Sequence, residues 1–159
     1  MSCGPRADPL DGPAADLYAA IAAVLERWLT DLTTRTALRH VGDVTAELEA
    51  DAREMAAAAA PVTLRRVHEL LATDVDEQRT NPLAVMRAAV AGPTAVLRSA
   101  GVPPPPRDEF DERTFPEDVY GLGPATWRDV DESLHEPGLM WGAWKAATVL
   151  RRRRSEGLR

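Results

Sequence analysis

Apolar side chains recur at helical spacing through the first hundred residues of the chain. The clearest stripe follows Pro13, a residue suited to the first turn of a helix, and ends before Gly42. Its members are spaced three and four residues apart: Tyr18, Ile21, Leu25, Trp28 and Leu32. This pattern predicts an amphipathic helix that buries one face and stops at the glycine.

Glycine and proline divide the following sequence into three more predicted helices. The expected boundaries are a cap at Asp43, a stop at Pro61, a cap at Thr63, a start at Pro82 and a break at residues 92–93. Helices of this length with short joints favour an antiparallel bundle of about four helices over residues 13–101. Residues 1–12 show no periodicity, which predicts a flexible N-terminal arm.

The rest of the chain is less regular. Four consecutive prolines at residues 103–106 exclude a long helix there, so residues 102–136 predict an irregular belt rich in proline and aromatic residues. Residues 137–150 are apolar on nearly every side, which is typical of a buried helix. The expected fold is therefore a single all-α domain: a helical bundle, a belt and a buried C-terminal helix.

Tryptophan is expected to form the core of this domain. Truncating a buried tryptophan costs roughly 3–5 kcal/mol, so large indoles are core residues by default. The structural core prediction covers all four: Trp28, Trp127, Trp141 and Trp144. Since three of them lie in the last third of the chain, we expect that third to close over the N-terminal helices and to leave no enclosed polar pocket for chemistry. Indoles that line an open cavity beside a histidine and acidic groups would instead indicate an enzyme.

Charge is distributed unevenly along the chain. The net charge is −6, but residues 145–159 carry +5 and the preceding 144 residues carry −11. An acidic body repels nucleic acid, so phosphate contacts are expected only from a basic tail at residues 151–159. Its arginines are Arg151, Arg152, Arg153 and Arg154. An anion- or nucleic-acid-binding module that uses this tail is one alternative function.

Several features predict a cytoplasmic protein without cofactors. Cys3 is the only cysteine, so no internal disulfide can form and a reducing compartment is favoured. The sequence has neither a signal peptide pattern nor an apolar run long enough to span a membrane. Glu132 and His135 form one Glu-x-x-His pair, but carboxylate di-iron sites need two such pairs, so no metal is expected.

Two arginine–histidine pairs suggest a second alternative function. Arg35 with His40, and Arg128 with His135, resemble the short signature of HEPN-type helical nucleases. The resemblance implies a metal-independent ribonuclease in which arginine stabilises charge at the scissile phosphate and histidine transfers a proton. HEPN pairs lie within a helix, whereas Pro137 is expected to leave His135 in a loop and Gly42 to place His40 at a helix end.

The favoured function is a non-enzymatic protein-interaction or adaptor module. Aromatic residues and arginine dominate interface hot spots, and an irregular segment is a natural place to present them. The predicted binding surface consists of Phe110, Phe115, Tyr120, Arg107 and Arg113. The partner would be another protein or a second copy of the chain.

Residues 74–150 also resemble a family of small helical actinobacterial proteins. The segments that carry the resemblance are Asp76-Glu-Gln-Arg79 with Asn81-Pro-Leu83, Arg107-Asp108, Phe115-Pro116 with Asp118, Tyr120-Gly-Leu122, Pro124-Ala125, and Trp141-Gly-Ala143 with Lys145-Ala146. The resemblance implies an actinobacterial origin and no particular activity.

Within this region Asp-Val-Asp-Glu occurs twice, at residues 74–77 and 129–132, which leaves open a pseudo-twofold arrangement of two similar loops.

Overall fold

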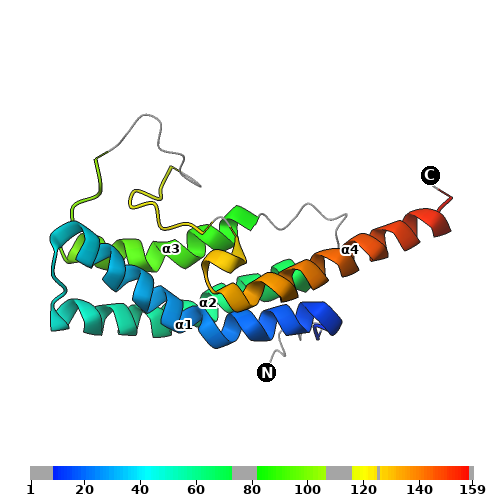
Figure 1. Cartoon of the computed structure of the whole chain (residues 1–159), viewed down its shortest axis with the longest axis horizontal. Coiled ribbons are helices and arrows are strands. Elements are labelled where there is room, and N and C mark those ends of the chain that lie inside the picture. Colours follow the sequence, from blue (N-terminus) through cyan, green and yellow to red (C-terminus); the bar gives the residue numbers. More distant parts are fainter. Residues whose placement is uncertain (1–8, 73–81, 107–115, 125, 158–159) are drawn as a thin grey trace, which may run out of the picture.

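The predicted all-α fold is confirmed. The computed structural model describes residues 9–72, 82–106, 116–124 and 126–157, and within these ranges it contains four α-helices, two 3-10 helices and no strand (Figure 1). The elements are α1 (Gly12–Val41), α2 (Ala46–Ala72), α3 (Pro82–Ser99), the 3-10 helices η1 (Trp127–Asp129) and η2 (Glu132–Leu134), and α4 (His135–Ser155). None of the helices in the described ranges is long and apolar enough to cross a membrane.

Helix α1 has the predicted limits. Pro13 lies in its first turn, and Gly42 ends it with a φ of 76°, a left-handed conformation that glycine adopts without a steric penalty. The Gly42 N–H donates to the Leu38 carbonyl at 2.9 Å, as expected for such a cap. The threonine-rich run at residues 33–36 does not interrupt the helix, because Thr33 is buried and its hydroxyl donates to the Leu29 carbonyl at 3.0 Å.

Helix α2 is one continuous helix where two were predicted. It runs through Pro61, and Thr63, predicted to be a cap, is buried in its middle. The alanines at residues 52, 56 and 60 pack in the interior, and this tertiary contact outweighs the local preference of proline to end a helix. The N-terminal cap is also displaced: Thr45, not Asp43, accepts a hydrogen bond from the Leu48 N–H at 3.1 Å.

Replacing Pro61 with alanine is expected to raise the free energy of unfolding by about 1–3 kcal/mol. Pro61 is exposed in the interior of α2, so alanine restores a backbone donor without losing core contacts. Chemical denaturation measures the change. Pro13→Ala is the matched control, because proline in a first turn costs no hydrogen bond, and no comparable gain is expected there. A loss of stability in Pro61→Ala would contradict this account of α2.

Helix α3 begins at Pro82 as predicted and continues through Pro93 to Ser99, so the predicted break at residues 92–93 is wrong. Gly92 lies where α3 approaches α2 closely. A Cβ at this position would lie 2.7 Å from the Met55 Sδ and 3.6 Å from the Ala59 Cβ. The glycine therefore permits a close contact between the two helices.

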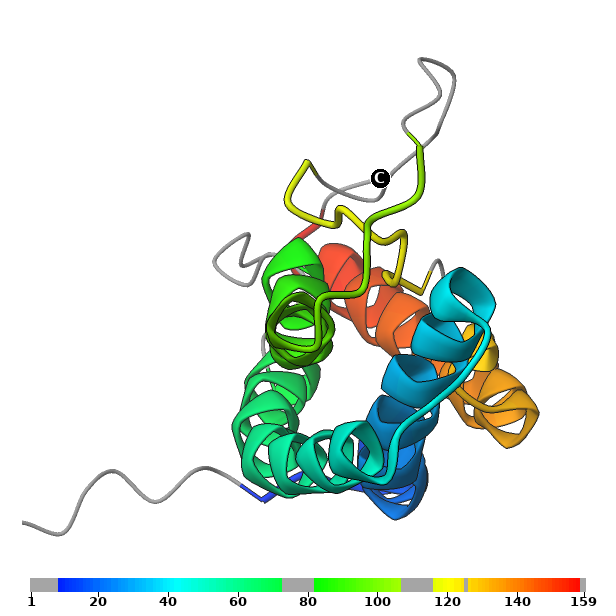
Figure 2. The same ribbon diagram turned by 90° about the vertical axis from the view of Figure 1, so that its left-hand side faces the viewer.

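The interior has two apolar clusters. The first lies among α1, α2 and α3 and is completed by Val130 and Leu134 from the segment before α4. The second joins the end of α1, the start of α2 and α3 to two later segments, through Val102 of the first and through Tyr120 and Leu122 of the second. The end-on view shows α1, α2 and α3 as a three-helix unit with the chain after α3 crossing one end (Figure 2).

Helix α4 differs from the prediction of a buried helix. The structure describes all 21 of its residues, and none of them is buried. Among the described elements it packs against α1, η1 and η2, so it is covered on one side only. Its C-terminal end extends past the other helices (Figure 1), and residues 151–155, predicted to be a tail, continue the helix. The sequence pattern predicted a helix covered on most sides, but the described part of the chain covers only one side of it.

Candidate functional site

An open groove lies between α1 and the start of α4. It has a volume of about 590 Å³, and we call it the α1–α4 groove. Its walls include Leu17, Trp127, Arg128, His135, Leu139 and Trp141. Two of the indoles line this open groove beside His135 and Asp129, so the C-terminal third does not close completely over the N-terminal helices. This is the arrangement that was expected to indicate an enzyme.

Local hydrogen bonds fix the shape of the segment that carries Trp127. Thr126 precedes η1, and both its N–H and its hydroxyl donate to the Asp129 carboxylate, at 2.8 and 3.2 Å. This reciprocal capping arrangement fixes the start of η1, whose first residue, Trp127, packs against the first apolar cluster. The Asp129 carboxylate is therefore committed to structure, although it lies at the groove.

Asp131 anchors the next turn in a similar way. Its carboxylate accepts hydrogen bonds from the Ser133 hydroxyl at 2.6 Å and the Ser133 N–H at 2.9 Å, and it lies 3.3 Å from an Arg27 nitrogen of α1. These hydrogen bonds, and then the Arg27 charge, hold the pKa of Asp131 below its usual value. Because the folded-state pKa is lowered, the anchor stabilises the fold above the unfolded pKa and is lost only as the pH falls through the folded one.

One of the two arginine–histidine pairs meets in the groove. Arg128 and His135 both line it, and both side chains are exposed. His135 is the first residue of α4, so the prediction that it lies in a loop is wrong. The reason is that Pro137 falls within the first turn, where its missing N–H costs nothing.

The other pair has separate partners. The Arg35 Nε donates to the Asp31 carbonyl at 3.2 Å, and its guanidinium lies 3.9 Å from the Asp31 carboxylate. The ring of His40, one residue before the end of α1, faces that of Tyr120 with 6.5 Å between their centroids. Of the two pairs, the structure therefore brings Arg128 and His135 to a common groove.

Of the predicted binding surface, only Tyr120 falls among the described residues; Phe110, Phe115, Arg107 and Arg113 lie outside them. Tyr120 is 6% exposed, and its hydroxyl donates to the Val102 carbonyl at 2.8 Å. The prediction that it faces a partner is therefore wrong. Its amphipathic ring closes the second apolar cluster instead.

The predicted core tryptophans differ in their environment. Trp28 is 7% exposed within the first apolar cluster, and Trp127 and Trp141 pack against that cluster while partly exposed. Trp144 is also partly exposed, and the Lys145 ammonium lies 5.2 Å from its ring centroid. The Trp141 Nε1 is buried without a hydrogen-bond partner among the described residues.

The outer side of α4 was missed in the sequence reasoning. Leu139, Met140 and Leu150 are 61%, 50% and 56% exposed, among the largest exposures of apolar side chains that the structure describes. The available signal was the presence of apolar residues on nearly every side of the helix, more than packing against one neighbouring helix can cover. Arg151, Arg153 and Arg154 continue the exposed surface at the C-terminal end, where Arg152 is partly covered.

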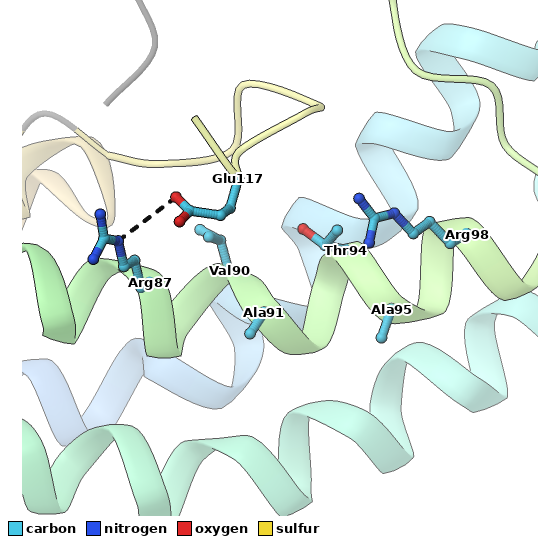
Figure 3. Close-up of a pocket in the computed structure, with 7 residues that line it drawn as sticks. All are labelled: Arg87, Val90, Ala91, Thr94, Ala95, Arg98 and Glu117. Carbon is cyan, nitrogen blue, oxygen red and sulfur yellow. Dashed lines mark ion pairs between the residues drawn. The ribbon is translucent and has the colours of Figure 1, made fainter. Parts of the chain in front are cut away.

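A second, smaller groove lies along α3. It has a volume of about 460 Å³, and the turn at residues 116–120 overhangs it (Figure 3). The Arg87 Nε lies 3.7 Å from the Glu117 carboxylate at one end, and Arg98 lies beside Thr94 at the other. The ion pair partly neutralises this groove, which makes it a weaker candidate than the α1–α4 groove for recognising a charged ligand.

Neither groove has the composition of a metal site. In the described part of the chain, no group of three or more histidine, cysteine, aspartate or glutamate side chains is placed to hold a metal ion.

Comparisons with protein-family models, with curated proteins and with solved structures found no match.

Proposed function

We propose that this protein is a non-enzymatic interaction module that binds a partner protein through the outer side of α4 and the adjoining α1–α4 groove. The observation that carries the proposal is the 21-residue α4, which has no buried residue and three large apolar side chains that are at least half exposed. Covering such a side chain contributes roughly 1.5–3 kcal/mol, so an uncovered row of them favours association.

The groove chemistry supports binding over catalysis. Asp129, which lines the groove, and Asp131 in the next turn are held by capping hydrogen bonds and are poorly placed to move protons. What remains is an apolar floor with two indoles, an arginine and a histidine. Exposed tryptophan and arginine beside apolar side chains are typical of interface hot spots.

An affinity capture with matched variants tests the proposal. The bait proteins are the wild type, the double variant Leu139→Asp/Leu150→Asp, and a control double variant Leu38→Asp/Val62→Asp. Both pairs are exposed, so each variant is expected to fold, and circular dichroism checks this. Mass spectrometry is expected to find proteins retained by the wild type and the control but reduced at least about tenfold with the α4 variant, since desolvated hot spots contribute 2 kcal/mol or more. The same proteins on all three baits would contradict the proposal.

A second candidate function is cleavage of RNA in the α1–α4 groove. The observation that favours it is the shared position of Arg128 and His135. Here the histidine would transfer a proton and the arginine would stabilise charge on the phosphate, which together support a metal-independent reaction.

The cleavage hypothesis predicts that purified protein degrades RNA in the presence of a chelator. His135→Ala is then expected to reduce the rate by about 10²-fold or more without unfolding the protein. His68→Ala is the control, because the His68 ring on α2 packs edge-on against Tyr18 of α1 and does not line the groove. Cleavage that is absent in the wild type, or equal in both variants, would exclude this function.

A further inference from the structure

We propose that the partner of α4 is a second copy of this chain, bound by antiparallel pairing of the two α4 helices. The inference rests on the proposed function, since it names the protein that covers the outer side of α4. It follows from the order of the residues on that side and from the packing of α4 against α1, which leaves that side exposed.

The inner side of α4 defines the outer one. Partly covered residues recur along one side of α4, at Trp141, Lys145, Thr148 and Arg152, and Trp141 packs against the first apolar cluster. With 3.6 residues per turn, the opposite side carries a line of six exposed residues at alternating spacings of three and four, which we call the outer seam. They are Glu136, Leu139, Ala143, Ala146, Leu150 and Arg153. Their spacing of three, four, three, four and three residues is that of the a and d positions of a coiled coil.

The outer seam is complementary to itself when it is reversed. Its order is acid, leucine, alanine, alanine, leucine, arginine, so an antiparallel copy matches every position. Leu139 meets Leu150 of the second copy, Ala143 meets Ala146 of the second copy, and Glu136 meets Arg153 of the second copy. A twofold axis between residues 144 and 145 repeats each contact, as an isologous dimer requires. The central alanines allow the helix axes to approach closely.

Parallel pairing lacks this complementarity. It would place the two Glu136 side chains together and the two Arg153 side chains together, and it would align the helix dipoles. Antiparallel pairing instead brings the arginines at the end of one α4 next to the start of the other. The chain there carries four carboxylates within eight residues: Asp129, Asp131, Glu132 and Glu136. The opposite charges of the C-terminal and preceding parts of the chain thus favour the same orientation.

The contact is accessible in the fold. On its inner side α4 packs against α1, and its C-terminal end extends past the other helices (Figure 1). The seam is short and its centre consists of alanine, so the buried area is smaller than the standard interface of about 1,600 Å². We therefore expect a dissociation constant of micromolar order, and assembly that weakens as salt screens the terminal charge pairs.

Sedimentation equilibrium on the purified full chain tests the association, at concentrations from about 1 to 200 µM that bracket this affinity. The wild type is expected to approach twice 17.3 kDa at the upper end. Leu150→Asp is expected to weaken the dimer by at least about tenfold, because it puts two charges into the apolar seam. Leu38→Asp, equally exposed on α1, is the control and should not change the mass.

Charge reversal and cross-linking test the orientation. Glu136→Arg should weaken the dimer, and the double variant Glu136→Arg/Arg153→Glu should restore it, which a non-specific loss of binding cannot do. In a Cys3→Ser background, mixing Ala143→Cys chains with Ala146→Cys chains should give a disulfide-linked dimer, while either variant alone should give little, because only the mixed pair lies within disulfide reach.

The outcomes separate the inference from the proposed function. A wild type that stays monomeric at every concentration, a dimer indifferent to Leu150→Asp, or efficient cross-linking of Ala143→Cys chains alone would overturn antiparallel pairing. If the purified chain is monomeric but α4-dependent capture of another protein holds, the inference fails and the proposed function stands. If the dimer forms as described and no other protein is captured, the antiparallel dimer is supported and binding of a different protein is excluded.

Discussion

Replacing Trp28 with alanine is expected to lower the free energy of unfolding by about 3–5 kcal/mol. The side chain is 7% exposed in the first apolar cluster, next to the fully buried Leu25 and Leu29 of the same helix. Alanine leaves a cavity that a three-helix core cannot close by small movements. Urea denaturation followed by circular dichroism measures the change.

The same truncation on α4 provides the control. Trp144 is partly exposed and lies outside both apolar clusters, so Trp144→Ala is expected to cost clearly less than Trp28→Ala. Native domains are stable by only about 5–15 kcal/mol, and Trp28→Ala should therefore shift the unfolding midpoint strongly. Equal losses for the two variants would mean that α4 contributes to the core as much as α1 does.

Replacing Asp118 with alanine is expected to cost about 2–5 kcal/mol, the second largest effect. Asp118 is 1% exposed, and its two carboxylate oxygens accept hydrogen bonds from the backbone N–H groups of Leu122 at 2.7 Å and Gly123 at 2.6 Å. Alanine leaves both donors without partners in a region that water reaches poorly. The segment at residues 116–124 then loses its attachment to the second apolar cluster.

Two further variants test whether the lost hydrogen bonds cause the destabilisation. Asp118→Asn keeps one acceptor oxygen and should lose less than Asp118→Ala. Glu117→Ala removes only the exposed ion pair with Arg87 and should change stability by about 0–1 kcal/mol. Hydrogen exchange should show faster exchange at Leu122 and Gly123 in Asp118→Ala. Unchanged exchange there would show that the two hydrogen bonds do not hold the segment.

Where local chemistry decides structure, the sequence was sufficient to predict the limits of a helix. The limits of α1 follow from a proline in the first turn and a glycine that adopts a left-handed conformation, and α3 starts at Pro82 for the same reason. Pro61 and Pro93 show the opposite case. Both were expected to interrupt helices, yet buried alanines and the close approach at Gly92 hold α2 and α3 together across them.

The candidate site was harder to predict because it depends on tertiary arrangement. Trp127, His135 and Trp141 share a groove only because η1 and η2 turn the chain tightly before α4, and sequence periodicity does not specify 3-10 turns. The apolar character of α4 was recognised, but whether its cover comes from the same chain or another one is not a property of the pattern. The pseudo-twofold arrangement suggested by the repeated Asp-Val-Asp-Glu at residues 74–77 and 129–132 stays a prediction, because the first copy lies outside the described residues.

Oxidative footprinting is the most direct measurement of the central claim that the outer side of α4 is a covered interaction surface in the cell. Reactivity would be compared between protein in native extract and the same protein purified and diluted, at Met140 and Leu150, with Leu38 of α1 as the exposed reference. We expect both α4 side chains to be protected in extract by several-fold relative to the diluted protein, with Leu38 unchanged. Equal reactivity of Met140 and Leu150 in the two samples would contradict the claim.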